Sequence, residues 1–581
     1  MHSVRKGKKV TQKTILSLGR VEERMAVLIR NWLRGFPMGD EEYAITPLKA
    51  IKVKRQLSYG GEFISKSIWD EFRLTELIDN AANTRSDIGI SPGKLVMIMT
   101  INRCVDPKSK LGIVDEWYPS SALQFLCGVS PEELYTNRLY RAMDHLNKNK
   151  DEIEQKLWKK TTREFGVNSD VILYDMTSTY FESAEVNDEK KEKCTLRKHG
   201  YSRDHRRDKK QVNWGLVLSK EGFPIAHEVY SGETPDKNTP QAICKRLKDR
   251  FKVERCVFVG DRGMMTAKNV EVIEEDYLYI LAEDFKNVKD LVYPEIEKIP
   301  QDLWQSNQSI DDRTKKGYGI KYIDENTLCI EMEMKEGEKT VRYLICHNKG
   351  KVEDDKKFRE KRLNTGREIL EKVRKTIKAG RLKNHDKVLK RIVKNLTKKK
   401  LDNYFGWEIP PTPVSDFRYW IRGDKLKEWE KQDGKWVVRT NIKAPSDDRE
   451  SDELKMSAEE IVTLYKDLKI VERAFRTIKS FIKVRPVGHQ LDTRIRAHIF
   501  ICVLAYLIEK TIEHKLKSSD RDMTAQRLFS MFKGIELVDT LLGDDVQILV
   551  SRVTERNDAQ RKILKHLEMK GIDSLNQSRY V

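Results

Sequence analysis

The feature that most restricts the fold is an alternation of apolar runs and helical patterns between residues 170 and 282. Short runs rich in β-branched and aromatic residues predict strands over 171–174, 211–218, 223–230, 256–259 and 277–282. Apolar residues at helical spacing predict helices over 238–252 and 266–275. A tight turn at Glu221-Gly222 joins the second and third strands. This order of elements predicts an α/β core.

Two of the predicted strands end at a carboxylate. The first run leads to Asp175, and the fourth leads through Gly260 to Asp261. An Asp that closes a strand is often only a turn or helix cap, so neither residue is decisive alone. Glu472 lies 211 residues after Asp261 and has a surface ion-pair partner available at Arg476. The order of the three acids along the chain is what favours a shared site.

Carboxylate oxygens are hard ligands that suit Mg²⁺ or Mn²⁺. Two such ions can activate a water or a 3′-hydroxyl and stabilise the leaving oxygen of a phosphodiester. We therefore assign Asp175, Asp261 and Glu472 as catalytic metal ligands for two ions. The sequence predicts a metal-dependent enzyme that cuts and joins DNA.

A helical pattern over 457–480 begins with a capping box, Ser457 to Glu460. Tyr465, Glu472 and Lys479 follow at intervals of seven, which places them on one face of a continuous helix. A phenol and an ammonium beside a carboxylate suit a phosphate and its metal ion. Tyr465 and Lys479 are thus predicted to contact DNA.

Positive charge is concentrated in one segment. Lys and Arg number 111 against 91 Asp and Glu, which gives +20 and favours a polyanionic partner. Residues 351–400 hold 20 Lys/Arg and 7 Asp/Glu, with apolar residues at helical spacing on both sides of Gly380. This basic helical arm is either a solvated surface or a contact for DNA phosphates. The same two alternatives apply to a basic loop with Arg203, Arg206 and Arg207.

The rest of the sequence narrows the class of protein. The eight cysteines form no C-x-x-C pair, which fits a reducing cytoplasm and argues against a zinc cluster. The longest apolar run, 499–508, is too short to cross a bilayer, so no membrane partner is expected. Alternation over 316–346 and again over 416–441 predicts strands, the latter with a hairpin turn at Asp433-Gly434.

These residues resemble the DDE transposases of bacterial insertion sequences, in the subgroup with the signature Tyr-x2-Arg-x3-Glu-x6-Lys. Tyr465, Glu472 and Lys479 match it in register, but the signature arginine falls on Leu468. Lys469 or Arg476 on the same helix could replace that DNA contact. The surroundings YDMTSTYF, VGDRGM and VERAFRTIKSFIKVRPVGH are also similar, and the resemblance covers about 170–510.

The resemblance implies an RNase H-like catalytic core interrupted by a β-rich insertion that carries the basic arm. It also implies binding to terminal inverted repeats and to target DNA, end cleavage and strand transfer, and a homodimer or larger synaptic complex. The expected location is the cytoplasm, at the nucleoid. The domains expected on this basis are a helical, DNA-binding region over 1–165, core over 166–300, insertion over 301–455, core with the Glu472 helix over 456–516, and a helical tail over 517–581.

Two other functions remain open from the sequence. One is an RNase H-like nuclease that cuts DNA without joining it. The other is a non-catalytic DNA-binding protein derived from a transposase, against which the intact acidic set argues.

Overall fold

The chain divides into two compact units in a computed structural model. Unit 2 comprises Gln56–Val538 and Arg552–Asn576, and unit 1 comprises Met1–Arg55, Asp539–Ser551 and Gln577–Val581. The structure describes residues 2–6, 9–13, 29, 48–83, 89–182, 194–253, 256–264, 266–305, 317–337, 339–410, 416–445, 454–517, 523–542 and 548–580.

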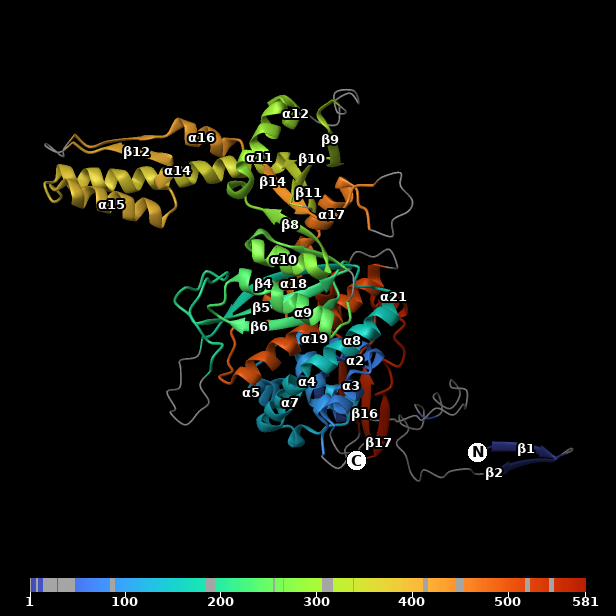
Figure 1. The fold of residues 1–581 in the computed structure, drawn as a ribbon. Helices are drawn as coiled ribbons and strands as arrows, with labels where there is room; N and C mark the ends of the chain where they lie inside the picture. Colours follow the sequence, from blue (N-terminus) through green and yellow to red (C-terminus); the bar gives the residue numbers. More distant parts are fainter. Residues whose placement is uncertain are drawn as a thin grey trace. The chain divides into compact units, whose positions relative to one another are not determined.

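A nine-stranded mixed sheet organises unit 2, so the protein is of the α/β class (Figure 1). Its order is β6-β5-β4-β7-β8-β14-β11-β10-β9. Strands β4, β7 and β8 are parallel, and the remaining neighbours are antiparallel. The bounds are β4 Val171–Tyr180, β5 Gln211–Ser219, β6 Pro224–Ser231, β7 Val257–Gly260, β8 Leu278–Glu283, β9 Ile320–Asp324, β10 Thr327–Glu336, β11 Lys339–Asn348 and β14 Lys435–Thr440.

The strands and helices predicted between 170 and 282 are confirmed, with one change in β4. That strand does not end at Asp175 but runs on to Tyr180. Its pairing with β7 stops at Tyr174 opposite Gly260, whereas its pairing with β5 continues to Tyr180 opposite Gln211. The helices are α9 Pro240–Asp249 and α10 Ala267–Asp276.

A helical layer is built around the long helix α19 (Asp492–Lys517), whose central turns are almost fully buried. The apolar run at 499–508 is therefore a core helix, and no helix in the described residues is long and apolar enough to cross a membrane. Helices α2, α4, α7 and α20 pack on it. The bounds are α2 Gly60–Glu71, α3 Leu74–Ala82, α4 Pro92–Val105, α5 Lys110–Gly112, α6 Leu123–Cys127, α7 Thr136–Lys148, α8 Lys150–Phe165, α20 Ala525–Phe532 and α21 Asp558–His566.

Two terminal regions differ from the prediction of helices alone. Strand β3 (Ile51–Ser58) precedes α2, and β1 (His2–Lys6) pairs with β2 (Lys9–Lys13) in a hairpin. The tail after 517 contains β15 (Glu536–Leu542), β16 (Ile548–Val553) and β17 (Gln577–Tyr580) besides its helices. Short runs with β-branched residues favour strands where a neighbouring strand offers hydrogen bonds. Strands β3, β15, β16 and β17 form one sheet in the order β17-β16-β15-β3.

A buried charge network joins α8 to the sheet. The Glu154 carboxylate accepts hydrogen bonds from Lys150 Nζ at 3.1 Å, from Arg246 Nη2 at 2.6 Å and from the His227 backbone N–H at 3.0 Å. Arg246 also pairs with Glu228. Burial lowers the pKa of His227 to about 4. This network fixes α8 against β6.

The segment expected as an insertion extends the same sheet, because β8 pairs with β14 and β14 with β11. Helix α12 (Gln301–Gln305) belongs to this segment, and α11 (Phe285–Lys298) directly precedes it. The predicted hairpin turn at Asp433-Gly434 is wrong. Helix α16 (Gly423–Glu430) precedes it, so the turn joins a helix to β14, and the φ of +70° at Gly434 explains the glycine.

The basic helical segment forms an arm (Figure 1). This arm has its own apolar core. Helices α14 (Lys349–Lys378) and α15 (His385–Lys398) pack side by side, separated by a turn with Gly380 at φ +67°. The hairpin of β12 (Phe405–Glu408) and β13 (Arg418–Ile421) completes the arm. Phe405 and Leu370 lie in its core, both fully buried.

Candidate active site

Asp175, in β4, and Asp261, directly after the parallel strand β7, occupy matching positions in the sheet. Each directly follows one member of the Tyr174–Gly260 pair, the last pair between β4 and β7. The preceding residues on both strands are buried and apolar, and this fixes the register that brings the two acids together. This register places the two acids at the same end of the β4–β7 pair.

The carboxylate of Asp175 is held in an environment that disfavours its charge. Burial raises its pKa from 3.8 to about 7, and the negative charges of Asp261 and Asp236 add to the rise. The Met176 N–H, which donates to Asp175 Oδ1 at 2.6 Å, and the Arg203 guanidinium act in the opposite direction. A bound cation would offset the repulsion that Asp261 and Asp236 exert on the Asp175 carboxylate.

Asp236 is an acid that the sequence reasoning missed. It begins the short 3-10 turn η4 (Asp236–Asn238), and its carboxylate lies near Gly263 in the turn after Asp261. It forms an ion pair with Arg203. The available signal was the run Thr234-Pro235-Asp236, a polar turn following β6, whose position in space the sequence does not show.

The predicted helix over 457–480 is two helices. Helix α17 (Ala458–Lys466) carries Tyr465, and α18 (Leu468–Ser480) carries Glu472 and Lys479, with a break at Asp467. The single-helix argument for a shared face is therefore wrong, although both helices pack on the sheet. Phe475 of α18 meets Trp214 of β5 edge to face, with ring centroids 5.0 Å apart. That contact positions α18 beside β4.

Tyr465 links the helices to the strand carboxylates. Burial raises the pKa of its phenol, and the charges of Asp261 and Glu472 add to the rise. A carboxylate changes the pKa of another group in this way only when the two lie close together. Asp261 and Glu472 therefore both lie near the Tyr465 phenol. The Glu472 side chain is exposed, as are Lys469 and Arg476 on the same helix.

The predicted phosphate contacts near the site are held by acids of the chain itself. Lys479 Nζ lies 2.9 Å from Asp204 Oδ1, and Arg485 pairs with the same carboxylate. Burial lowers the pKa of Lys479. Asp204, 5% exposed, was also missed from the sequence, because it lies within a loop read only for its positive charge.

The basic loop itself is similarly paired in part. Arg203 binds Asp236, and Arg206 binds Asp208 at 2.9 Å while its guanidinium lies 5.1 Å from the centre of the Tyr180 ring. Arg207 is exposed. These pairs order the loop beside the Asp175 strand.

Two of the carboxylates at this site fit a divalent cation, but no third ligand is grouped with them in the ranges that the structure describes. Asp175 and Asp261 offer adjacent hard oxygens, and the raised pKa of Asp175 is what a cation would relieve. Within the described residues, no three His, Cys, Asp or Glu side chains are grouped closely enough to hold a metal ion. A third ligand would have to approach the two strand acids.

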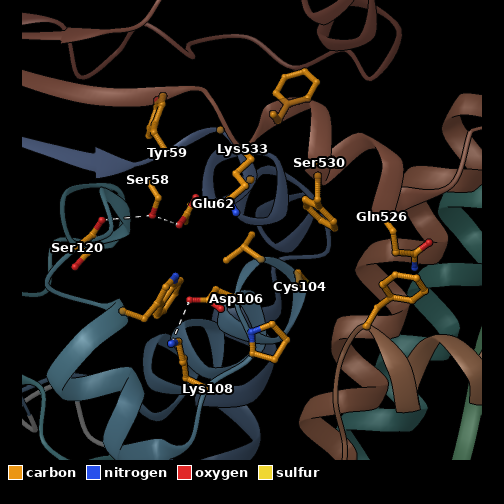
Figure 2. Close-up of a pocket in the computed structure, with 18 of the residues that line it drawn as sticks. Ser58, Tyr59, Glu62, Cys104, Asp106, Lys108, Ser120, Gln526, Ser530 and Lys533 are labelled. Atoms are coloured by element: carbon orange, nitrogen blue, oxygen red, sulfur yellow. Dashed lines mark hydrogen bonds and ion pairs between the residues drawn. The ribbon is translucent and has the colours of Figure 1, made fainter.

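A separate cavity of about 760 Å³ lies beyond the end of α18 (Figure 2). Ser480, Phe481 and Lys483 line it together with residues from α2, α4 and α20. Figure 2 shows Ser58 between Glu62 and Ser120, and Asp106 facing Lys108. Burial raises the pKa of Glu62. None of the predicted metal ligands lines this cavity.

Comparisons with known proteins give a partial family match. Residues 62–157 match the model of DUF4277, a domain of unknown function. No curated protein sequence matches the chain. A cryo-EM structure of the piggyBac transposase synaptic complex with hairpin DNA is similar at 8% identity and a TM-score of 0.33, covering 81% of this chain and 78% of that chain. The Mos1 transposase paired-end complex with the left transposon end is similar at 12% identity and a TM-score of 0.14, covering 46% and 68%.

Proposed function

We propose that this chain is a DDE-type DNA transposase, which cuts the ends of a DNA element and joins them to a target. The observation that carries the proposal is the Asp175–Asp261 pair directly after the last rung between β4 and β7, together with Tyr465, whose phenol is acted on by the charges of both Asp261 and Glu472. The excess of 20 positive charges supports a nucleic acid substrate.

Asp175, Asp261 and Glu472 are the residues that would hold Mg²⁺ or Mn²⁺. Two such ions, when bound, supply activation of the attacking water or 3′-hydroxyl and stabilisation of the leaving oxygen. Glu472 is exposed on α18, and holding the ions would require its carboxylate to approach the strand acids. The repulsion between Asp175 and Asp261 is the force that such a cation would remove.

Around these acids the chain offers groups that bind DNA phosphates. Lys479 and Arg203 are paired with Asp204 and Asp236, and phosphate oxygens would compete for the same donors. Tyr465 offers a phenol beside Asp261. Lys469 and Arg476 of α18, with Arg206 and Arg207 of the loop, extend the positive surface for the repeat ends and the target.

The test is cleavage of a supercoiled plasmid that carries the gene with its natural flanking DNA, in millimolar Mg²⁺ or Mn²⁺. Asp175→Asn, Asp261→Asn and Glu472→Gln keep the side-chain shape, and each should reduce end cleavage by roughly 100-fold or more, on the order of a lost catalytic ligand. Binding to the same DNA should persist. Glu275→Gln, an exposed acid on α10 of the same sheet layer, is the matched control and should cleave normally.

Joining is tested separately with precut ends that carry a free 3′-hydroxyl. Joined product supports a transposase, whereas cleavage without joining would make the protein a nuclease. Absence of any metal-dependent cutting by the unmodified chain would instead leave a DNA-binding protein. Full activity in any one of the three acid variants would remove that residue from the proposed set.

A further inference from the structure

Helix α15 carries two opposed stripes of side chains. Val388, Ile392 and Leu396, four residues apart, are fully buried in the core of the arm. At about 100° per residue, five cations fall within one stripe on the other side of the helix. All five are exposed: Lys387, Lys390, Arg391, Lys394 and Lys398.

In the part of the chain that the structure describes, none of these five cations forms an ion pair. The one acid of α15 is Asp386, in the first turn of the helix. Helix α14 differs, because acids are interspersed among its cations, as in the pair Arg374–Glu371, and because its Arg359 pairs with Asp433 in the turn before β14. Among the described residues, the row of cations without acidic partners is therefore a property of α15 and not of the whole arm.

Like charges three and four residues apart repel one another and weaken a helix. The helix is nevertheless fixed, because Asn384 caps it by accepting the Lys387 N–H at 3.0 Å and its apolar stripe packs against α14. A rigid row of unneutralised cations is an arrangement that a polyanion would stabilise.

The length of the row fits a nucleic acid backbone. From Lys387 to Lys398 the helix rises about 16 Å, while duplex DNA carries one negative charge per roughly 1.7 Å of its axis. An anionic membrane suits it less, because an interfacial helix inserts its apolar face into lipid, and that face of α15 is buried inside the protein.

We propose that the exposed cationic face of α15, comprising Lys387, Lys390, Arg391, Lys394 and Lys398, binds the phosphate backbone of duplex DNA without reading its sequence. None of the proposed metal ligands lies on this face, so it is a second DNA contact, remote in sequence from the acidic site. Its role would be to hold DNA that extends beyond the cleavage point.

The test changes three of the five cations in the full chain, as Lys390→Gln, Arg391→Gln and Lys394→Gln. The probe is a fluorescent duplex of arbitrary sequence, titrated at several salt concentrations in EDTA. Each lost phosphate contact lowers the slope of log K against log salt by about 0.9, so we expect a slope shallower by about 2.7 and binding weaker by roughly 10- to 100-fold at physiological salt.

The matched control removes the same charge elsewhere, as Lys562→Gln, Lys565→Gln and Lys570→Gln, all exposed in the α21 region. It should bind within about twofold of the unmodified chain with a slope near the original, because these side chains make no phosphate contact in this proposal. An equal loss in both variants would mean that net charge alone matters and would overturn the proposal. So would an arm variant with unchanged slope and affinity.

Two further measurements distinguish a phosphate contact from damage to the helix and from binding to lipid. The exchange Lys390→Arg, Arg391→Lys and Lys394→Arg keeps the charge and should keep binding, whereas a loss there would show damage to the helix and count against a backbone contact. Vesicles containing phosphatidylserine test the lipid alternative: loss of vesicle binding with intact DNA binding refutes the proposal. Because EDTA prevents metal-dependent cutting, the result does not depend on whether the acidic site is catalytic.

Discussion

Replacing Asp175 with Asn should make the metal-free protein more stable, although the same change should abolish cleavage. The pKa of this carboxyl is raised from 3.8 to about 7 by burial and by its acidic neighbours. Above pH 7 the folded chain must therefore keep a charge that the unfolded chain carries more easily. Asparagine has the same shape and no charge, so it removes that cost.

The magnitude follows from the two pKa values. Each pKa unit corresponds to about 1.4 kcal/mol, so a rise from 3.8 to about 7 corresponds to about 4 kcal/mol at most. Water reaches part of the side chain and screens it, which reduces the expected gain to about 2 kcal/mol. A gain of that size should raise the melting temperature by a few degrees.

The dependence on pH gives the sign of the effect. An acid with a raised folded-state pKa binds more protons when folded, so stability falls as pH rises from 3.8 towards 7 and then stays level. The advantage of Asp175→Asn should thus be full at pH 8 and about a third as large at pH 5.

The assay is thermal unfolding of both proteins at pH 5, 6.5 and 8, without metal and then with millimolar Mg²⁺. Added Mg²⁺ should stabilise the unmodified protein at pH 8 and have little effect on the variant. Asp208→Asn is the control, because Arg206 lowers the pKa of Asp208 to about 2 and its removal should bring no gain. A variant no more stable than the parent at pH 8, or equally stabilised at all three pH values, would refute the reasoning.

Two other predictions concern buried acids. Asp204→Asn should free Lys479 and Arg485 from their shared carboxylate, so DNA binding in EDTA should tighten by several-fold; weaker binding would mean that Asp204 positions these cations for DNA. Glu154→Ala should remove the buried carboxylate that Lys150 and Arg246 share, leaving Glu228 as their common partner, and should lower the free energy of unfolding by about 3–5 kcal/mol, measured by chemical denaturation. A loss below about 1 kcal/mol would contradict that account of the network.

The strands of the core could be predicted from the sequence because each contains an apolar run long enough to indicate a buried strand. The second half of β4 could not, because Thr177, Ser178 and Thr179 are polar yet buried under the pairing with β5. A criterion based on apolar runs stops at Asp175 for this reason. The break between α17 and α18 at Asp467 could not be predicted either, because the apolar spacing continues unchanged through both helices.

Some of the acids around the site could be predicted from the sequence and others could not. Asp175 and Asp261 each follow a recognisable apolar run, so the sequence could single them out, whereas the parallel pairing of the two strands is seen only in the structure. Asp204 and Asp236 lie in polar loops, where no periodicity indicates which side chains meet. Their partners Lys479 and Arg203 are 275 and 33 residues away in the chain. Only the folded backbone identifies such pairs.

The arm has no linker at its base. Strand β11 ends at Asn348, and the same residue caps α14 by accepting the Lys351 N–H at 3.3 Å. Strand β14 returns from the arm and pairs with both β11 and β8, and β8 pairs with the β7 strand that leads to Asp261. The sheet therefore carries both the two ends of the arm and the strand that leads to Asp261, so backbone hydrogen bonds between strands connect the base of the arm with the acidic edge.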